Sequence, residues 1–230
     1  MAVLDPVKVV IDNWEDGRRE TLDASQVSGQ AFGASQVSGL ASSRLVELPN
    51  NPLDPAAGTR KVPFGKEIWI DRADFMEVPE KKFFRMAPGQ EVRLRGACIF
   101  KCTGCVKDDA GKVVEIHGTW DTESWGGNAA DGRKVKGTIH WVDCATGKPA
   151  EVRLYDKLFL EKDPMKDGSE NFLKYLNPDS LKVVTGYVEP ALADAAAGEH
   201  FQFERTGYFV CDSKLVFNRT CSLKDSYKPA

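Results

Sequence analysis

The chain has 230 residues, of which 42% are hydrophobic and 28% charged, and its formal net charge is −3. This composition is typical of a globular protein, and no apolar run approaches the roughly 20 residues that cross a bilayer. The amino terminus lacks the basic region and apolar core of a signal peptide, so we expect a cytoplasmic protein. The slight negative charge argues against indiscriminate binding to nucleic-acid backbones, but a local basic face remains compatible with RNA binding.

Alternating apolar and polar residues predict strands along much of the chain. Six segments fit half-buried strands, namely 7–12, 91–100, 113–120, 136–142, 151–159 and 200–210. Turn signals stand at 109–111, 131–132 and 145–149. Many short strands at this spacing favour a mainly all-β fold of antiparallel β-barrels or sandwiches.

Only two short pieces have a helical pattern. The first is 169–176, which starts at a capping serine, and the second is 189–198, which has an early proline and a final glycine. The hexapeptide Ala-Ser-Gln-Val-Ser-Gly occurs twice within 24–39, which is too few copies for a repeat fold, so we expect an insertion in a loop. A loop at 145–150 predicts one domain over 1–148 and a second over 149–230, whose last strands can return to the first.

No pattern for catalysis is present, so we expect no catalytic residue in this chain. There is no glycine-rich phosphate loop, and His117, His140 and His200 are isolated from any local acid or nucleophile pattern. The spacing Cys102-Thr-Gly-Cys105 lacks the second pair or the histidines that a zinc site needs. We therefore expect no metal and idle thiols in a reducing compartment.

Binding is the better interpretation of several polar residues on predicted strands. Arg93 and Arg95 alternate and so share one face, where two planar guanidinium groups can meet bases or phosphates. Gln202 falls opposite the neighbouring phenylalanines, and Arg205 falls in phase with them unless a bulge intervenes. The alternative is that these side chains only form the solvated face of a half-buried sheet.

Several blocks of the sequence, in order and with one gap at the insertion, closely resemble the carboxy-terminal region of glutaminyl-tRNA synthetases. These blocks are 58–64, 67–75, 131–137, 139–141, 151–156, 201–205 and 216–219. The resemblance implies two antiparallel β-barrels, of the type found in some ribosomal proteins and in the anticodon-binding part of that synthetase, with a few short helices. It runs from about residue 3 to about residue 224.

The resemblance also implies which residues meet the anticodon. Positions matching Arg93 and Arg95 meet the first base in that family, and those matching Gln202 and Arg205 meet the middle uracil. The position matching Arg85 meets the third base. This fits the physics, because unpaired bases offer their pairing edges to arginine and glutamine donors.

Other basic residues are candidates for the backbone of the anticodon stem. Arg133, Lys134 and Lys136 form a basic run, for which a solvated turn is the alternative interpretation. The same two interpretations apply to Lys157. Where the family often has a lysine before the third-base arginine, this chain has Phe84, which cannot donate a hydrogen bond but can stack on a base.

The resemblance implies a monomeric anticodon-binding fragment whose partners are glutamine tRNA and a catalytic domain in the same polypeptide, with no membrane. ATP would be used by that domain, and no cofactor is expected in the anticodon-binding region itself. One alternative is the matching part of a glutamyl-tRNA synthetase, and another is a ribosomal-type RNA-binding β-barrel. A stand-alone enzyme is the weakest interpretation, since no residue can be assigned to its chemistry.

Overall fold

The computed structural model describes residues 1–15, 43–166, 168 and 171–223, so the duplicated insertion at 24–39 and the capping Ser169 lie outside the described residues. The chain divides into two compact units. Unit 1 is Met1–Lys148 with Tyr187–Ala193, and unit 2 is Pro149–Gly186 with Asp194–Ala230. Among the described residues, no helix is long and apolar enough to cross a membrane.

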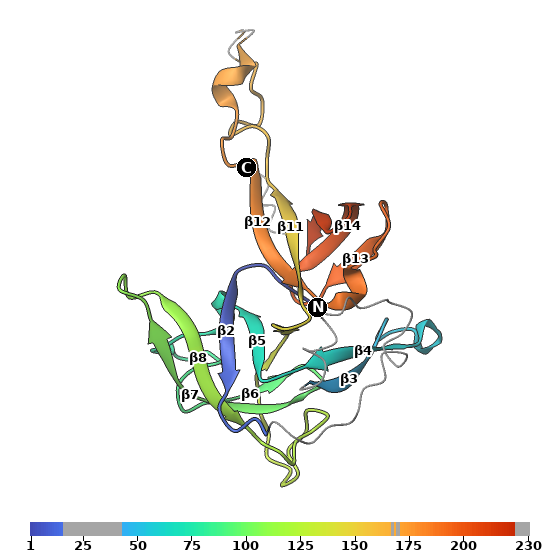
Figure 1. Cartoon of the computed structure of the whole chain (residues 1–230). Coiled ribbons are helices and arrows are strands. Elements are labelled where there is room, and N and C mark those ends of the chain that lie inside the picture. Colours follow the sequence, from blue (N-terminus) through green and yellow to red (C-terminus); the bar gives the residue numbers. More distant parts are fainter. Residues whose placement is uncertain (16–42, 167, 169–170, 224–230) are drawn as a thin grey trace. The chain divides into compact units, whose positions relative to one another are not determined.

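Unit 1 is built on a seven-stranded sheet that curls on itself (Figure 1). Its order is β10 (Val142–Asp143), β5 (Glu67–Asp71), β2 (Pro6–Ile11), β8 (Val113–Trp120), β7 (Cys98–Lys107), β6 (Glu91–Leu94), β9 (Thr138–Ile139). Most neighbours pair antiparallel, whereas β2 with β8 and β6 with β9 are parallel. A separate hairpin joins β3 (Arg44–Pro49) to β4 (Thr59–Phe64).

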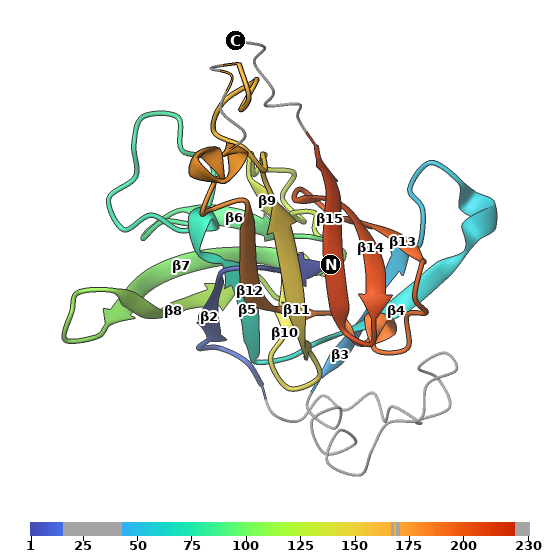
Figure 2. The ribbon, with the colours of Figure 1, turned by 90° about the horizontal axis from the view of Figure 1, so that it is seen from above.

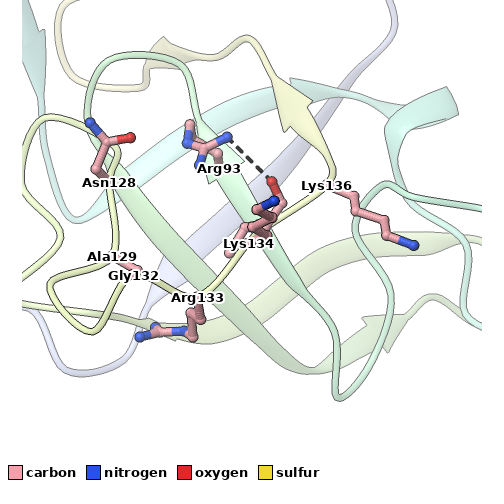
Figure 3. A pocket seen from close by; sticks show the side chains of 8 residues that line it. Arg93, Asn128, Ala129, Gly132, Arg133, Lys134 and Lys136 are labelled. Atoms are coloured by element: carbon pink, nitrogen blue, oxygen red, sulfur yellow. Dashed lines mark hydrogen bonds between the residues drawn. The ribbon is translucent and has the colours of Figure 1, made fainter.

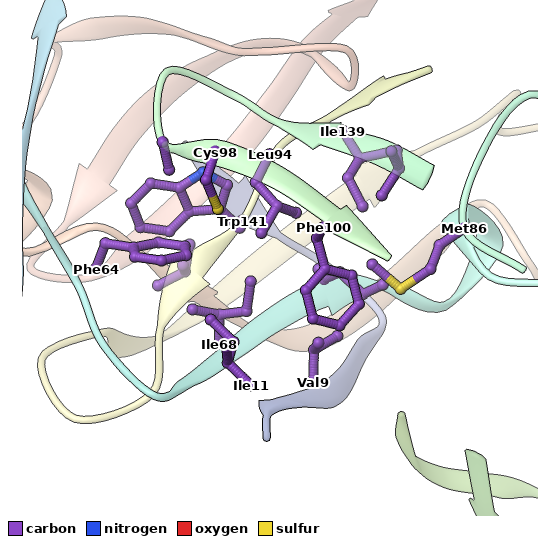
Figure 4. Close-up of a cluster of buried hydrophobic side chains, with 14 of the residues drawn as sticks. Val9, Ile11, Phe64, Ile68, Met86, Leu94, Cys98, Phe100, Ile139 and Trp141 are labelled. Atoms are coloured by element: carbon purple, nitrogen blue, oxygen red, sulfur yellow. The ribbon is translucent and has the colours of Figure 1, made fainter. Parts of the chain in front are cut away.

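The core of unit 1 follows from the two-residue period of its strands. In β2, Val7, Val9 and Ile11 are buried, while the residues between them are partly exposed. Trp141 is fully buried and meets Phe64 edge to face, with ring centroids 4.8 Å apart (Figure 4). This close-packed core holds the strand ends that carry the candidate binding residues.

The segment expected as one strand over 91–100 is two strands of a hairpin. Gly96 has a φ of +69°, and the backbone N–H of Ala97 donates to the carbonyl of Leu94 at 2.9 Å, which closes the turn between β6 and β7. The single-strand expectation was wrong because the alternating residues of β6 lead directly into the apolar residues of β7, and Gly96 is the single turn-forming residue between them. The hairpin places Arg95 in the turn, directly after β6.

The returning segment Tyr187–Ala193 is held within unit 1 by stacking and charge. Its Tyr187 stacks on Trp69, with ring centroids 4.8 Å apart and planes at 10°. Its Glu189 is almost fully buried and accepts hydrogen bonds from Nε and Nη2 of Arg60 at 3.0 and 2.9 Å. Tyr187 and Val188 also pair with β1 (Ala2–Val3).

Unit 2 is a second curled sheet, in the order β12 (Leu181–Val188), β11 (Lys148–Tyr155), β15 (Val216–Ser222), β14 (Gly207–Ser213), β13 (His200–Phe203) (Figure 2). Strands β11 and β15 are parallel, and β13, β14 and β15 form an antiparallel meander. The mainly all-β fold in two barrel-like sheets is thus confirmed.

Several sequence expectations about the part of the chain after residue 168 need correction. The segment 200–210 is again a hairpin and not one strand, because β13 ends at Phe203 and β14 starts at Gly207. The two expected helices are only single 3-10 turns, η4 at Phe172–Tyr175 and η5 at Pro190–Leu192. Forming the first turn of an α-helix costs free energy that only the hydrogen bonds of a longer helix offset. Capping signals in such short segments therefore do not produce an α-helix.

Candidate nucleic-acid interface

A pocket in unit 1 is lined by several of the sequence-predicted basic residues. Its volume is about 450 Å³, and it is lined by Arg93, Asn128, Ala129, Gly132, Arg133, Lys134, Val135 and Lys136 (Figure 3). Arg93 comes from β6, and the other residues come from the long connection between β8 and β9. The pocket therefore joins a strand to a loop that lies 35 or more positions later in the sequence.

The connection is tied to the sheet by its own polar groups. The fully buried Ser124 accepts from the backbone N–H of Ile99 at 2.8 Å, and the N–H of Gly126 donates to the carbonyl of Ala97 at 2.8 Å. These bonds attach the start of the connection to the β6–β7 hairpin. Its end is attached by Gly137, whose carbonyl accepts from the N–H of Arg93 at 2.8 Å.

Arg93 forms one wall of the pocket and also holds the loop opposite. Its Nε donates to the carbonyl of Gly127, and its Nη1 lies 3.3 Å from the carbonyl of Val135 (Figure 3). A guanidinium group has five donors in a fixed plane, so it can hold two carbonyls and still present N–H groups to a ligand. The role expected from sequence is thereby extended, because Arg93 also builds the pocket.

Arg95 continues the alternation beyond the end of β6. Val92 and Leu94 are fully buried, whereas Arg93 and Arg95 are partly exposed. The backbone N–H of Arg95 donates to the carbonyl of Ile139 at 3.0 Å. The carbonyl of Arg95 accepts from the indole N–H of Trp141 at 3.1 Å. The buried tryptophan thus fixes the turn that carries this arginine.

Arg85 lies on a loop that is anchored against the 3-10 turn η3 (Arg72–Asp74). Its Nη1 donates to the carbonyl of Ala73 at 2.9 Å, and its Nε lies 3.4 Å from the carboxylate of the buried Asp74. Nearly half of the side chain, 46%, is nevertheless exposed. A charged group held in place and still exposed is suited to contact a ligand.

Arg133 makes contacts that the sequence did not reveal. It pairs with Glu91 of β6 at 3.0 Å, with Asp121 at 2.7 Å and with Asp131 at 2.9 Å. Figure 3 shows its guanidinium pointing away from Arg93. Three carboxylates compensate its charge, so within the basic run Lys134 and Lys136 are the residues that offer positive charge to the pocket.

In unit 2 the candidate residues lie at the edge strand of the sheet. Gln202 is exposed on β13 and faces the exposed Tyr208 of β14 in register. Arg205 lies in the turn between those strands with a φ of +65°. The expectation that it would be in phase with the phenylalanines was wrong, because the strand ends before it.

The phenylalanines below this turn form a compact base for it. Phe203 and Phe209 stack with ring centroids 4.2 Å apart, and Phe217 meets Phe203 at 5.3 Å. The N–H of Thr206 donates to the carbonyl of Phe203 at 2.9 Å and closes the turn. Lys157, expected near the RNA backbone, is exposed just after β11.

The cysteines of the expected idle pair differ in exposure. Cys102 is buried, which raises the pKa of its thiol to about 11, and Cys105 is partly exposed. Among the described residues, one group brings three side chains with metal-ligand atoms together, namely Asp71, Asp74 and His140. His140 is buried between β9 and β10, and its Nε2 lies 2.9 Å from Asp71.

His117 has two acidic neighbours, of which Asp12 is brought close only by the fold. Its Nδ1 lies 2.8 Å from Asp12, which follows β2, and its Nε2 lies 2.8 Å from Glu115. The hydrogen bond with Asp12, followed by that with Glu115, raises the pKa of the imidazole. This arrangement gives the stability of unit 1 a dependence on pH.

The stabilisation by His117 is expected to be complete below its unfolded pKa of about 6.5 and to be lost as pH rises through the higher folded value. Because the pair is partly exposed, we expect at most about 1 kcal/mol. Thermal unfolding of the chain and of His117→Gln should therefore show a difference at pH 5.5 that shrinks by pH 8.5. A difference in Tm that stays constant over this range would contradict the expectation.

The chain is similar to known proteins over almost its whole length. Two family models, both described as tRNA synthetases class I (E and Q), anti-codon binding domain, match residues 32–121 and 138–212. The chain is 46% identical to the glutamine-tRNA ligases of Clostridium kluyveri, Nitrosomonas europaea and Bradyrhizobium diazoefficiens, over 99% of its length. It spans 38%, 38% and 37% of those relatives, little more than a third of each.

Proposed function

Because the chain belongs to the family of class I tRNA synthetase anticodon-binding domains (E and Q), we propose that it binds the anticodon loop of glutamine tRNA. The observation that carries the proposal is the pocket of unit 1, which has a volume of about 450 Å³ and whose lining includes Arg93, Lys134 and Lys136. A nucleotide needs such a combination of positive charge and directed N–H donors.

The base contacts are divided between the two units. Arg93 and Arg95 meet the first anticodon base, and Arg85 meets the third. Gln202 and Arg205 meet the middle uracil, whose pairing edge offers both donor and acceptor groups. Support comes from the exposure of Gln202, Arg205 and half of Arg85, all of which lie at strand ends or in anchored turns.

Contacts with the RNA backbone are assigned to lysines. Lys134 and Lys136 border the pocket, and Lys157 is exposed on unit 2. Arg133 is left out of this assignment, since it already pairs with three carboxylates and would have to release them to bind phosphate.

Each unit corresponds to one anticodon-binding domain, with the border at residues 148 and 149 and the segment 187–193 returning to the first. The complete protein would be a monomeric, cytoplasmic glutamine-tRNA ligase, in which a catalytic domain of the same polypeptide uses ATP. The names of the relatives favour glutamine over glutamate as the amino acid.

The proposal is tested by titrating this chain at moderate, stated salt with three RNAs. These are glutamine tRNA, the same tRNA with its middle anticodon base changed, and an unrelated helical RNA. We expect the native tRNA to bind most tightly, with a penalty of about 1–3 kcal/mol for the changed base, by analogy with a mismatched DNA base pair. Equal affinity for all three RNAs, or affinity for none, would contradict the proposal for this chain.

A further inference from the structure

Phe84 is a large apolar residue that is half exposed beside an anchored segment of backbone. Half of it, 50%, is accessible to solvent, although it lies only two positions before the fully buried Met86. Met86 is fixed by two backbone hydrogen bonds. Its N–H donates to the carbonyl of Asp74 at 2.9 Å, and its carbonyl accepts from the N–H of Met76 at 3.1 Å. An aromatic ring at the surface next to anchored backbone offers a π-face to a ligand.

The loop that carries Phe84 packs directly against the pocket. Gly137 approaches the carbonyl of Phe84 so closely that a Cβ there would fall far inside van der Waals contact with that oxygen. The carbonyl of Gly137 in turn accepts from the N–H of Arg93. Phe84, Gly137 and Arg93 are therefore three adjacent parts of one structure.

A cation stands beside the ring and also borders the pocket. Nζ of Lys136 lies 4.6 Å from the centroid of Phe84, within the range of a cation–π interaction. Lys136 is also a lining residue of the pocket, and Figure 3 shows its side chain pointing away from Arg93. The pair thus presents an aromatic face and a positive charge next to the exposed Arg85.

We propose that Phe84 and Lys136 form a stacking site for one unpaired base, namely the third anticodon base that Arg85 meets. The ring stacks on the base, and Lys136 takes the phosphate of the same nucleotide. This inference rests on the proposed function and adds a specificity device to it. Aromatic faces accept every base but bind the larger purines more strongly, so Phe84 supplies affinity and a purine preference, while Arg85 distinguishes between purines.

Three variants test the stacking site. Phe84→Leu is expected to lower affinity for glutamine tRNA by about 5- to 150-fold, with the same loss for either purine at the third position. Phe84→Trp should retain affinity, since it keeps a π-face. The matched control is Phe172→Leu, the same change at another exposed phenylalanine, which should leave affinity unchanged. Tm is measured for each, and Phe84→Leu should unfold like the unmodified chain.

A spectroscopic measurement reports stacking directly. Glutamine tRNA is prepared with 2-aminopurine as its third anticodon base, whose fluorescence is quenched when it stacks on an aromatic ring. Quenching on binding is expected with the unmodified chain and with Phe84→Trp, and loss of quenching with Phe84→Leu. For Lys136→Met we expect the slope of log affinity against log salt to fall by about one, with base preference unchanged.

The outcomes separate the two proposals. If the unmodified chain prefers the native anticodon but Phe84→Leu binds and quenches as well as it does, the stacking site is wrong and anticodon binding stands. If the unmodified chain shows no preference for the native anticodon, both proposals are wrong. A smaller loss for Phe84→Leu with a third-base purine than with a pyrimidine would contradict the purine preference alone.

Discussion

Replacing Gly137 with alanine is expected to destabilise unit 1 by about 1–3 kcal/mol or more and to weaken RNA binding at the same time. The new Cβ would meet the backbone oxygen of Phe84 and lie 3.3 Å from Cγ2 of Val92. Neither neighbour can yield easily, because one is backbone and the other is a fully buried side chain. The loop bearing Phe84 or the end of the pocket connection must therefore move.

The measurement for Gly137→Ala is thermal unfolding combined with the tRNA titration. A chain of this size loses about 2–4 °C in Tm for each kcal/mol, so a drop of several degrees is expected. Affinity for the tRNA should fall as well, since the carbonyl of Gly137, which accepts from the N–H of Arg93, would be displaced.

The control for this substitution is Gly104→Ala on β7, where a Cβ would meet nothing within 4 Å. That change should alter stability by no more than about 0.5 kcal/mol. If both alanine variants unfolded alike, the close approach at Gly137 would not be a constraint.

Replacing Arg205 with glycine is expected to weaken reading of the middle anticodon base. Arg205 has a φ of +65°, a left-handed conformation that costs a residue with a Cβ roughly 1–2 kcal/mol and that glycine adopts freely. Strained backbone conformations of this kind cluster at functional sites. Removing the side chain should therefore relieve backbone strain and weaken recognition of the middle base.

The titration for Arg205→Gly compares native glutamine tRNA with the tRNA carrying a changed middle base. We expect the preference of the chain for uracil, about 1–3 kcal/mol by analogy with bidentate contacts to DNA bases, to fall, because only Gln202 remains to read that base.

Arg153→Ala is the matched control for Arg205→Gly, because Arg153 of unit 2 pairs with Glu151 and Asp212 at the surface. It should keep the full preference for uracil. A uniform loss of affinity for both tRNAs with Arg205→Gly would mean that Arg205 only contacts phosphate.

Local pattern determined most of the strands and the all-β class. In β2 and β8 the two-residue period of buried side chains is visible in the sequence itself, because it depends only on the pleat of an extended chain. The resemblance to a known family also carried the candidate residues and the function proposed for them. These conclusions needed no contact between distant residues.

Tertiary structure alone decided where the hairpins turn and what the charged residues do. An apolar run that folds back on itself has the same period as one long strand, so the turns at Gly96 and Arg205 became visible only through pairing. Arg133 and His117 meet partners that the chain brings together from 42 and 105 positions away. Such contacts arise from strand order and packing, which a local pattern does not contain, and they decide which cations are compensated and which remain for a ligand.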